Sequence, residues 1–193
     1  MIRSITAIAG ALCLGGCVHA WVLEPAPSAP RAPGANVAQE SVAGVTVAVS
    51  TDRRDGQPWD LNVRYTAVRV KVENHSHRPL AVQYGAFDLA TEKGARFSPA
   101  AWERGEIEPL PGRGPLYDDE RRLDWLEWLG AHDLVKRVLP VGAVPDGATA
   151  SGYIYFERVP EAPFAVRFEM TLIDAATGQR FGRVELPFLT LRT

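Results

Sequence analysis

Apolar and polar residues alternate with a period of two along most of the chain from about residue 42 onward. The clearest case runs from Phe164 to Leu172, where apolar side chains alternate with Arg167, Glu169 and Thr171. Such alternation is typical of a strand with one buried face and one solvated face. The turn-forming sequence DAATGQ comes next, and it predicts a hairpin that returns along RFGRVELPFLTL.

Two other runs change the parity of their apolar positions halfway. In NVRYTAVRVKVEN, the switch falls between Ala67 and Val68, and in PLAVQYGAFDLATEKG it falls at Gly85. A β-bulge shifts a strand by one residue, so the pattern predicts a bulge at each place. The sequence GYIYFE is apolar on both parities, which favours a central strand buried on both faces.

These runs amount to about seven strands, separated by clusters of Gly, Pro, Asn and Asp. They predict a mainly β protein in which two antiparallel sheets form a sandwich over residues 42–193. The stretches VRVKVENHSHRPLAVQYGAFDLATEKG and GYIYFERVPEAPFAVRF resemble bacterial immunoglobulin-like domains. The resemblance implies an immunoglobulin-like sandwich, and it implies a fold rather than a reaction.

Residues 112–140 interrupt the period of two. Acidic residues from Asp118 to Glu120 favour a helix N-terminus, and Gly130 favours a stop, so we expect a short helix over about 118–129 within a helical insertion. Its apolar arc spans roughly 220°, which is wider than one packing face requires. Two hypotheses remain open: the helix plugs the sandwich, or it exposes a partner-binding surface formed by Trp125, Trp128 and Leu129.

The first seventeen residues have a basic start, an apolar core at residues 4–14 and the final sequence LGGC. The core has the length of a signal-peptide h-region and is too short to span a membrane. LGGC resembles the lipobox of bacterial lipoprotein precursors. The resemblance implies that signal peptidase recognises Leu14, Gly15 and Gly16, removes residues 1–16, and leaves Cys17 carrying a thioether-linked diacylglycerol and an acylated amino terminus.

The residues after Cys17 extend this interpretation. Val18 stands where an Asp often marks inner-membrane retention in lipoproteins, so the resemblance favours the outer membrane, with the chain facing the periplasm. Residues 24–36 carry four prolines among Ala and Ser, a composition typical of extended polyproline II. We therefore expect residues 17–41 to form a lipidated tether ahead of the sandwich.

The charge and the cysteine content limit the functions that the protein can have. The 193 residues include 21 Lys and Arg against 23 Asp and Glu, a net charge of −2 that gives no bulk attraction to nucleic acid. Cys13 and Cys17 are the two cysteines, so the body has no thiolate nucleophile. His75 and His77 lie in a predicted turn without a third ligand nearby, and no phosphate loop or catalytic motif is present. No metal site or cofactor is predicted.

Three functions fit these observations. We favour a non-enzymatic envelope lipoprotein with a protein-interaction, accessory or assembly role, whose partners are the membrane and an envelope protein. The alternative is a binding module for lipid, glycan or a small molecule, in which Trp59, Trp102, Trp125 and Trp128 offer stacking surfaces. An enzyme with dispersed carboxylates ranks last, because it requires a pocket that holds two carboxylates close together.

Overall fold

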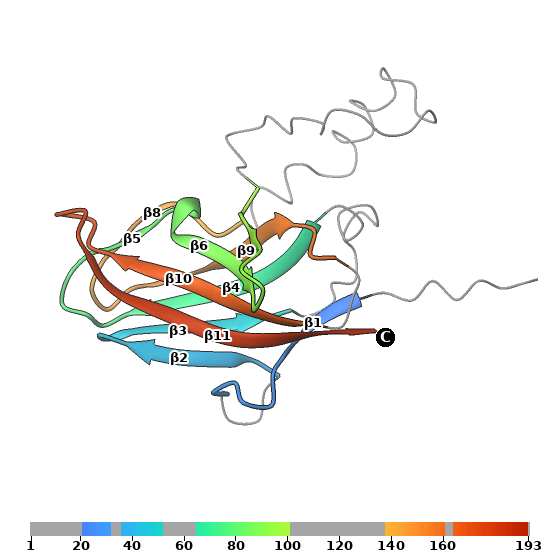
Figure 1. Cartoon of the computed structure of the whole chain (residues 1–193). Helices are drawn as coiled ribbons and strands as arrows, with labels where there is room; N and C mark the ends of the chain where they lie inside the picture. Colours follow the sequence, from blue (N-terminus) through green and yellow to red (C-terminus); the bar gives the residue numbers. More distant parts are fainter. Residues whose placement is uncertain (1–20, 32–35, 52–64, 101–137, 161–163, 193) are drawn as a thin grey trace, which may run out of the picture.

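The structure, a computed structural model, describes residues 21–31, 36–51, 65–100, 138–160 and 164–192, and it consists mainly of β-strands (Figure 1). The strands are β1 (Trp21–Pro25), β2 (Ala38–Val42), β3 (Val45–Ser50), β4 (Tyr65–Asn74), β5 (Leu80–Val82), β6 (Phe87–Thr91), β7 (Arg96–Phe97), β8 (Gly142–Val144), β9 (Thr149–Glu157), β10 (Ala165–Ile173) and β11 (Arg180–Arg192). One 3₁₀ turn, η1 (Tyr84–Ala86), precedes β6. The predicted mainly β class is confirmed. The predicted helix at 118–129 lies outside the described residues.

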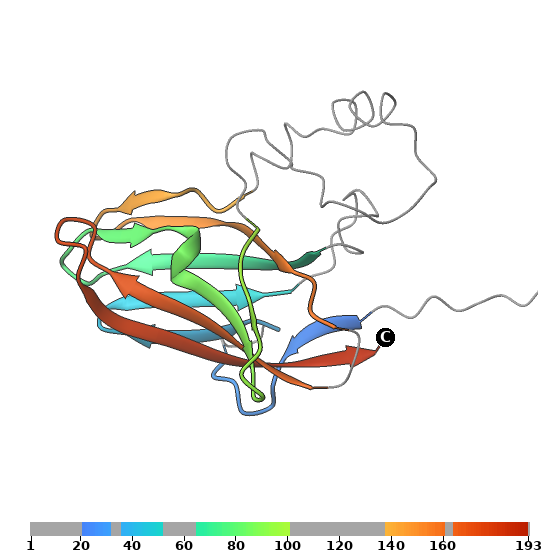
Figure 2. The same ribbon diagram turned by 45° about the horizontal axis from the view of Figure 1, so that its top comes forward.

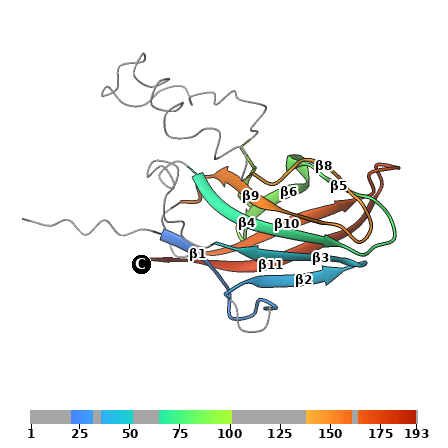
Figure 3. The same cartoon turned by 180° about the vertical axis from the view of Figure 1, so that it is seen from behind.

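The labelled strands form three sheets, and all their pairings are antiparallel. Sheet A has the order β1-β11-β10-β6-β7, sheet B has the order β2-β3-β4-β9, and β5 pairs with β8 in a small third sheet. Sheets A and B lie over one another, as the view from behind also shows (Figure 3). The chain passes from sheet B to sheet A twice, between β4 and β6 and between β9 and β10, so each sheet contains strands distant in sequence.

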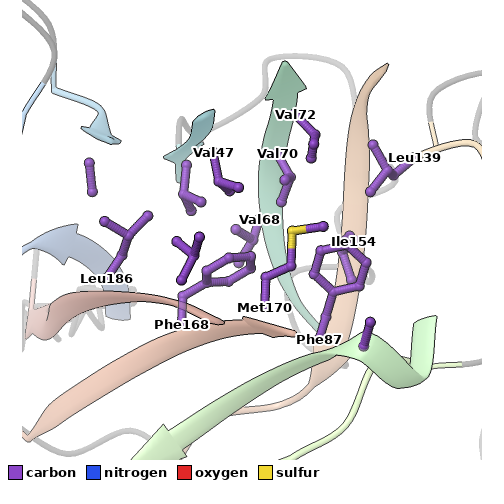
Figure 4. Packing of buried hydrophobic residues seen from close by; sticks show 14 of the residues in the cluster. Val47, Val68, Val70, Val72, Phe87, Leu139, Ile154, Phe168, Met170 and Leu186 are labelled. Carbon is purple, nitrogen blue, oxygen red and sulfur yellow. The ribbon is translucent and has the colours of Figure 1, made fainter. Parts of the chain in front are cut away.

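The core lies between sheets A and B and is built from the inward side chains of both. Val68, Val70 and Val72 of β4 point toward Phe168 and Met170 of β10 (Figure 4). Each of these side chains has a relative exposure of 1% or less. Burying one such side chain contributes roughly 1.5–3 kcal/mol to the free energy of unfolding. Every second side chain of β10 points into this core, and that is why apolar and polar residues alternate along the strand.

Neither predicted bulge is present, and each parity switch has another cause. β4 pairs with β9 from Tyr65 to Glu73 without a shift in register, so Ala67 faces away from the core while Val68 faces into it. Ala67 is apolar because the outer face of this sheet is also covered. At the second switch the chain changes sheets: β5 pairs with β8, η1 turns the backbone, and β6 then pairs with β10.

Part of the predicted proline-rich tether belongs to the sandwich. β1 pairs with β11, and the backbone N–H of Ala26 donates to the carbonyl of Pro187 at 3.0 Å. Ala29 is buried, and the N–H of Gln39 donates to the carbonyl of Pro30 at 2.8 Å. Prolines are tolerated here because β1 is an edge strand, where a missing N–H leaves no ladder bond broken. The described fold therefore includes residues well before the predicted boundary at 42.

Candidate functional site at the edge of β9

Every residue that the sequence nominates for function lies outside the described part of the chain. These positions are Leu14, Gly15, Gly16 and Cys17, and the tryptophan-bearing group of Trp59, Trp102, Trp125, Trp128 and Leu129. The structure does describe the residues from which the segment 101–137 departs and to which it returns. From here on the insertion means residues 101–137, which contain most of the 112–140 stretch considered above. The site is built from the described residues on either side of it.

Both ends of this insertion are held on the same edge of β9. On one side, the N–H of Ala100 donates to the carbonyl of Tyr155 at 2.8 Å, and the N–H of Glu157 donates to Ser98 at 3.1 Å. On the other side, the N–H of Leu139 donates to the carbonyl of Tyr153 at 2.9 Å. β9 is therefore the last strand of sheet B rather than the central strand predicted, and the two segments occupy its outer edge.

Leu139 and Gly152 fix the returning segment. The Leu139 side chain has 0% relative exposure and belongs to the main core. A Cβ on Gly152 would lie 2.5 Å from the Cα of Leu139 and 2.6 Å from the carbonyl carbon of Val138, which is far inside van der Waals contact. The absence of a side chain at Gly152 is what lets the backbone of residues 138–139 approach β9.

The outer face of β9 carries a second apolar cluster, separate from the main core. Tyr153 and Tyr155 have relative exposures of 6% and 1%, and their rings stack with centroids 6.4 Å apart. Tyr65, Ala67 and Val138 pack against the pair. Two buried tyrosines on the outer face of a sheet explain why GYIYFE is apolar on both parities. The prediction that this strand is buried on both faces is confirmed.

A charged array on the outer face of sheet A centres on Glu169, whose relative exposure is 3%. Arg167 Nε donates to Glu169 Oε1 at 2.9 Å, Arg96 Nη1 lies 3.2 Å from Oε2, and Arg183 pairs with the same oxygen. Burial raises the pKa of Glu169, but the hydrogen bonds from Arg167 and Arg183 and the nearby positive charges outweigh it and lower the pKa below 4.5.

This array is structural in character. Asp88 pairs with Arg96 at 2.8 Å, and Glu185 pairs with Arg183 at 3.0 Å and with Arg167 at 3.5 Å. Three acidic and three basic side chains thus balance, and the array offers no net charge to a ligand. The sequence pattern placed Glu169 on the outer face correctly, but it gave no signal that arginines on neighbouring strands would cover the carboxylate.

The two histidines belong to a corner of hydrogen-bonded turns. His77 Nδ1 lies 3.2 Å from Asp146 Oδ2, and the backbone N–H of His77 donates to Asp146 Oδ1, which lowers the pKa of that carboxyl. Buried Asn74 donates from Nδ2 to the carbonyl of Val144 at 2.8 Å. Within the described ranges, no group of three or more His, Cys, Asp or Glu is arranged to hold a metal ion.

A shallow hollow between β6, β10 and β11 has a volume of about 110 Å³ and is lined by residues that include Ala90, Val166 and Pro187. Pockets that enclose small ligands are usually about 300 Å³ or larger, so this hollow does not favour the ligand-binding alternative. Comparisons of the chain with protein-family models, curated proteins and solved structures find no match. No helix among the described residues has the length and apolar character needed to cross a bilayer.

Proposed function

We propose that the protein is a bacterial envelope lipoprotein, anchored through acyl chains on Cys17, with a non-enzymatic accessory or assembly role. The proposal includes an immunoglobulin-like sandwich and a location at the outer membrane facing the periplasm. Leu14, Gly15, Gly16 and Cys17 support the anchor because they form a lipobox-like sequence after an apolar core. Two facing antiparallel sheets, between which the chain passes four times, support the immunoglobulin-like assignment.

The observation that carries the interaction role is the fixation of both insertion ends on β9. Tyr153 and Tyr155, which accept hydrogen bonds from the two ends, are neighbours on the same side of the strand. A connection between such close points needs only about two to six residues, whereas residues 101–137 form a far longer one. Binding residues are disproportionately found on loops that a rigid scaffold positions. A partner surface in this segment would be displayed at a defined place.

The residues proposed for contact suit a protein partner. Trp125, Trp128 and Leu129 lie within the insertion, and tryptophan is enriched among the residues that contribute most to protein–protein binding. Nothing in this role requires a reaction or a cofactor. The partner class is an envelope protein that binds the insertion, whose two ends are fixed on β9.

The anchor is tested by intact-mass measurement of the protein made in its native bacterium. We expect cleavage before Cys17 and the added mass of a diacylglycerol, and a Cys17→Ser variant should lose both. A bare thiol in the wild-type protein, or a retained leader, would contradict the lipoprotein assignment.

The interaction role is tested in living cells with a photo-cross-linking amino acid. It replaces Trp125 or Trp128 in two variants and Ala176, in the exposed β10–β11 turn, in a matched control. We expect the same envelope protein to be captured from positions 125 and 128 and not from 176. Loss of folding in the Trp125→Ala, Trp128→Ala double variant would instead show that the tryptophans are core residues, and would contradict the docking role.

A further inference from the structure

The two ends of the sandwich differ in construction. At one end, four turns connect strands: Ala43–Gly44, and the turns after β4, β8 and β10 (Figure 2). They are joined to each other, because the N–H of His75 donates to Gly44 at 2.8 Å, that of Gly147 donates to Asn74 at 2.6 Å, and that of Ala175 donates to Pro79 at 2.8 Å. We call this the distal end.

The opposite end is where the described chain enters the fold, and we call it the proximal end. β1 begins there at Trp21, directly opposite Arg192 at the end of β11. β3 also ends on this side, where the hydroxyl of Thr51 donates to the carbonyl of Leu23. Figure 1 shows the chain end marked C beside β1, with the β10–β11 turn at the far side of the molecule.

The distance between Cys17 and the fold is short. Four residue steps separate Cys17 from Trp21, so a fully extended chain spans at most about 14 Å. A tether that ran to residue 41 in polyproline II would span about 75 Å. β11 covers twelve residue steps, and at about 3.3 Å per step it places the distal turns about 40 Å from the proximal end.

We infer that the proximal end rests on the lipid headgroup layer of the bilayer that holds the acyl chains, while the distal turns face the aqueous compartment. The inference rests on the proposed acylation of Cys17, because the short connection between Cys17 and β1 orients the sandwich only if the Cys17 sulfur is fixed in the membrane. The reach of about 14 Å is smaller than the length of the sandwich, so the distal end cannot take the place of the proximal one.

One exposed apolar side chain, Leu191, agrees with this orientation, whereas Val141 lies directly before β8 and away from the β1–β11 end. Among the residues that the structure describes, Val141 and Leu191 are the exposed large apolar side chains, with relative exposures of 58% and 39%. Leu191 lies at the proximal end, opposite Val22 in the β1–β11 ladder. The headgroup layer accepts apolar side chains that emerge beside polar ones, so contact with lipid would remove this exposed apolar surface from water.

The test places a fluorescent thiol label at each end of the lipidated, full-length protein. Leu191→Cys marks the proximal end, and Ala176→Cys in the β10–β11 turn is the matched distal control. With Cys17 acylated as proposed, its sulfur is in a thioether and Cys13 is removed with residues 1–16, so the introduced thiol is the free one. Vesicles contain phosphatidylcholine, phosphatidylglycerol and a lipid with a nitroxide on its headgroup. If Leu191→Cys does not fold, Glu157→Cys, exposed at the end of β9, replaces it.

We expect the nitroxide lipid to quench the proximal label by at least half and to leave the distal label within a tenth of its unquenched intensity. Equal quenching at the two positions, or quenching at the distal one only, would overturn the inference while membrane anchoring stands. If mass measurement finds no diacylglycerol and the Cys17→Ser variant binds vesicles as the wild type does, the proposed function fails and the inference fails with it.

Discussion

Replacing Gly152 with alanine should detach the returning end of the insertion from β9. The new Cβ would meet backbone atoms only, at 2.5 Å from the Cα of Leu139 and 2.6 Å from the carbonyl carbon of Val138. Backbone atoms cannot rotate away as a flexible side chain can, so the segment at 138–139 must move by about 1 Å or more to reach ordinary contact distance. Such a shift breaks the hydrogen bond from Leu139 to Tyr153.

The expected loss of stability in Gly152→Ala is the sum of the interactions that the segment at 138–139 makes with the rest of the fold. The lost hydrogen bond contributes about 1 kcal/mol, and full burial of the Leu139 side chain contributes roughly 1.5–3 kcal/mol. We expect Gly152→Ala to lower the free energy of unfolding by about 2.5–4 kcal/mol if the segment leaves entirely. Without such crowding, the same substitution in a strand would be stabilising by about 0.5–1 kcal/mol, so the sign itself is informative.

Urea unfolding followed by circular dichroism measures this cost, and hydrogen exchange at the Leu139 amide reports whether the segment has moved. Gly85→Ala is the matched control, because a Cβ at Gly85 meets nothing within 4 Å. Combining Gly152→Ala with Leu139→Ala should cost about 2 kcal/mol less than the two single effects together, since both remove the same contact. Wild-type stability in Gly152→Ala, with a protected Leu139 amide and additive effects, would refute the reasoning.

Two further substitutions test other parts of the fold. Glu169→Gln should cost about 1–3 kcal/mol at pH 7, because hydrogen bonds to charged groups are lost and the arginines around it are about half exposed. The pKa of Glu169 is lower in the folded chain than its ordinary 4.5, so the stability that its carboxylate contributes is present above pH 4.5 and declines as the pH falls below that value. Below pH 4.5, the unfolding curves of Glu169→Gln and the wild type should therefore converge. Leu23→Ala should cost about 2–3 kcal/mol in urea unfolding, since Leu23 is 5% exposed in β1, whereas Pro27→Ala, exposed beside it, should cost under about 0.5 kcal/mol. Equal, negligible effects at 23 and 27 would mean that the segment is a free tether after all.

The strands with one solvated face were predictable because a period of two leaves a direct mark in the sequence. β10 shows this best: Val166, Phe168, Met170 and Leu172 are inward and buried, as their spacing predicts. The hairpin to β11 was predictable for a similar reason, because its turn chemistry is local. Asp174 Oδ1 accepts backbone hydrogen bonds within the turn.

The candidate site was less predictable, because its key contacts join residues distant in the chain. Gly152 is one glycine among 17 in the sequence, and its role depends on Leu139 arriving beside it from another segment. The parity switch at Ala67 predicts a bulge that the structure lacks, since nothing local reveals that Tyr153 and Tyr155 cover the outer face of sheet B. The proline content of this region likewise gives no indication that β1 pairs with β11.

The sequence by itself determined the mainly β class, the inward residues of β10 and the turn that follows it. It also provides the lipobox-like LGGC on which the proposed anchor depends. The tertiary structure decided the sheet order, the place of the early proline-rich residues in sheet A, the burial of Glu169 under arginines, and the fixation of both insertion ends on β9. The physical reason is range: alternation and turn chemistry act between neighbours, whereas burial and strand pairing depend on residues that only folding brings together.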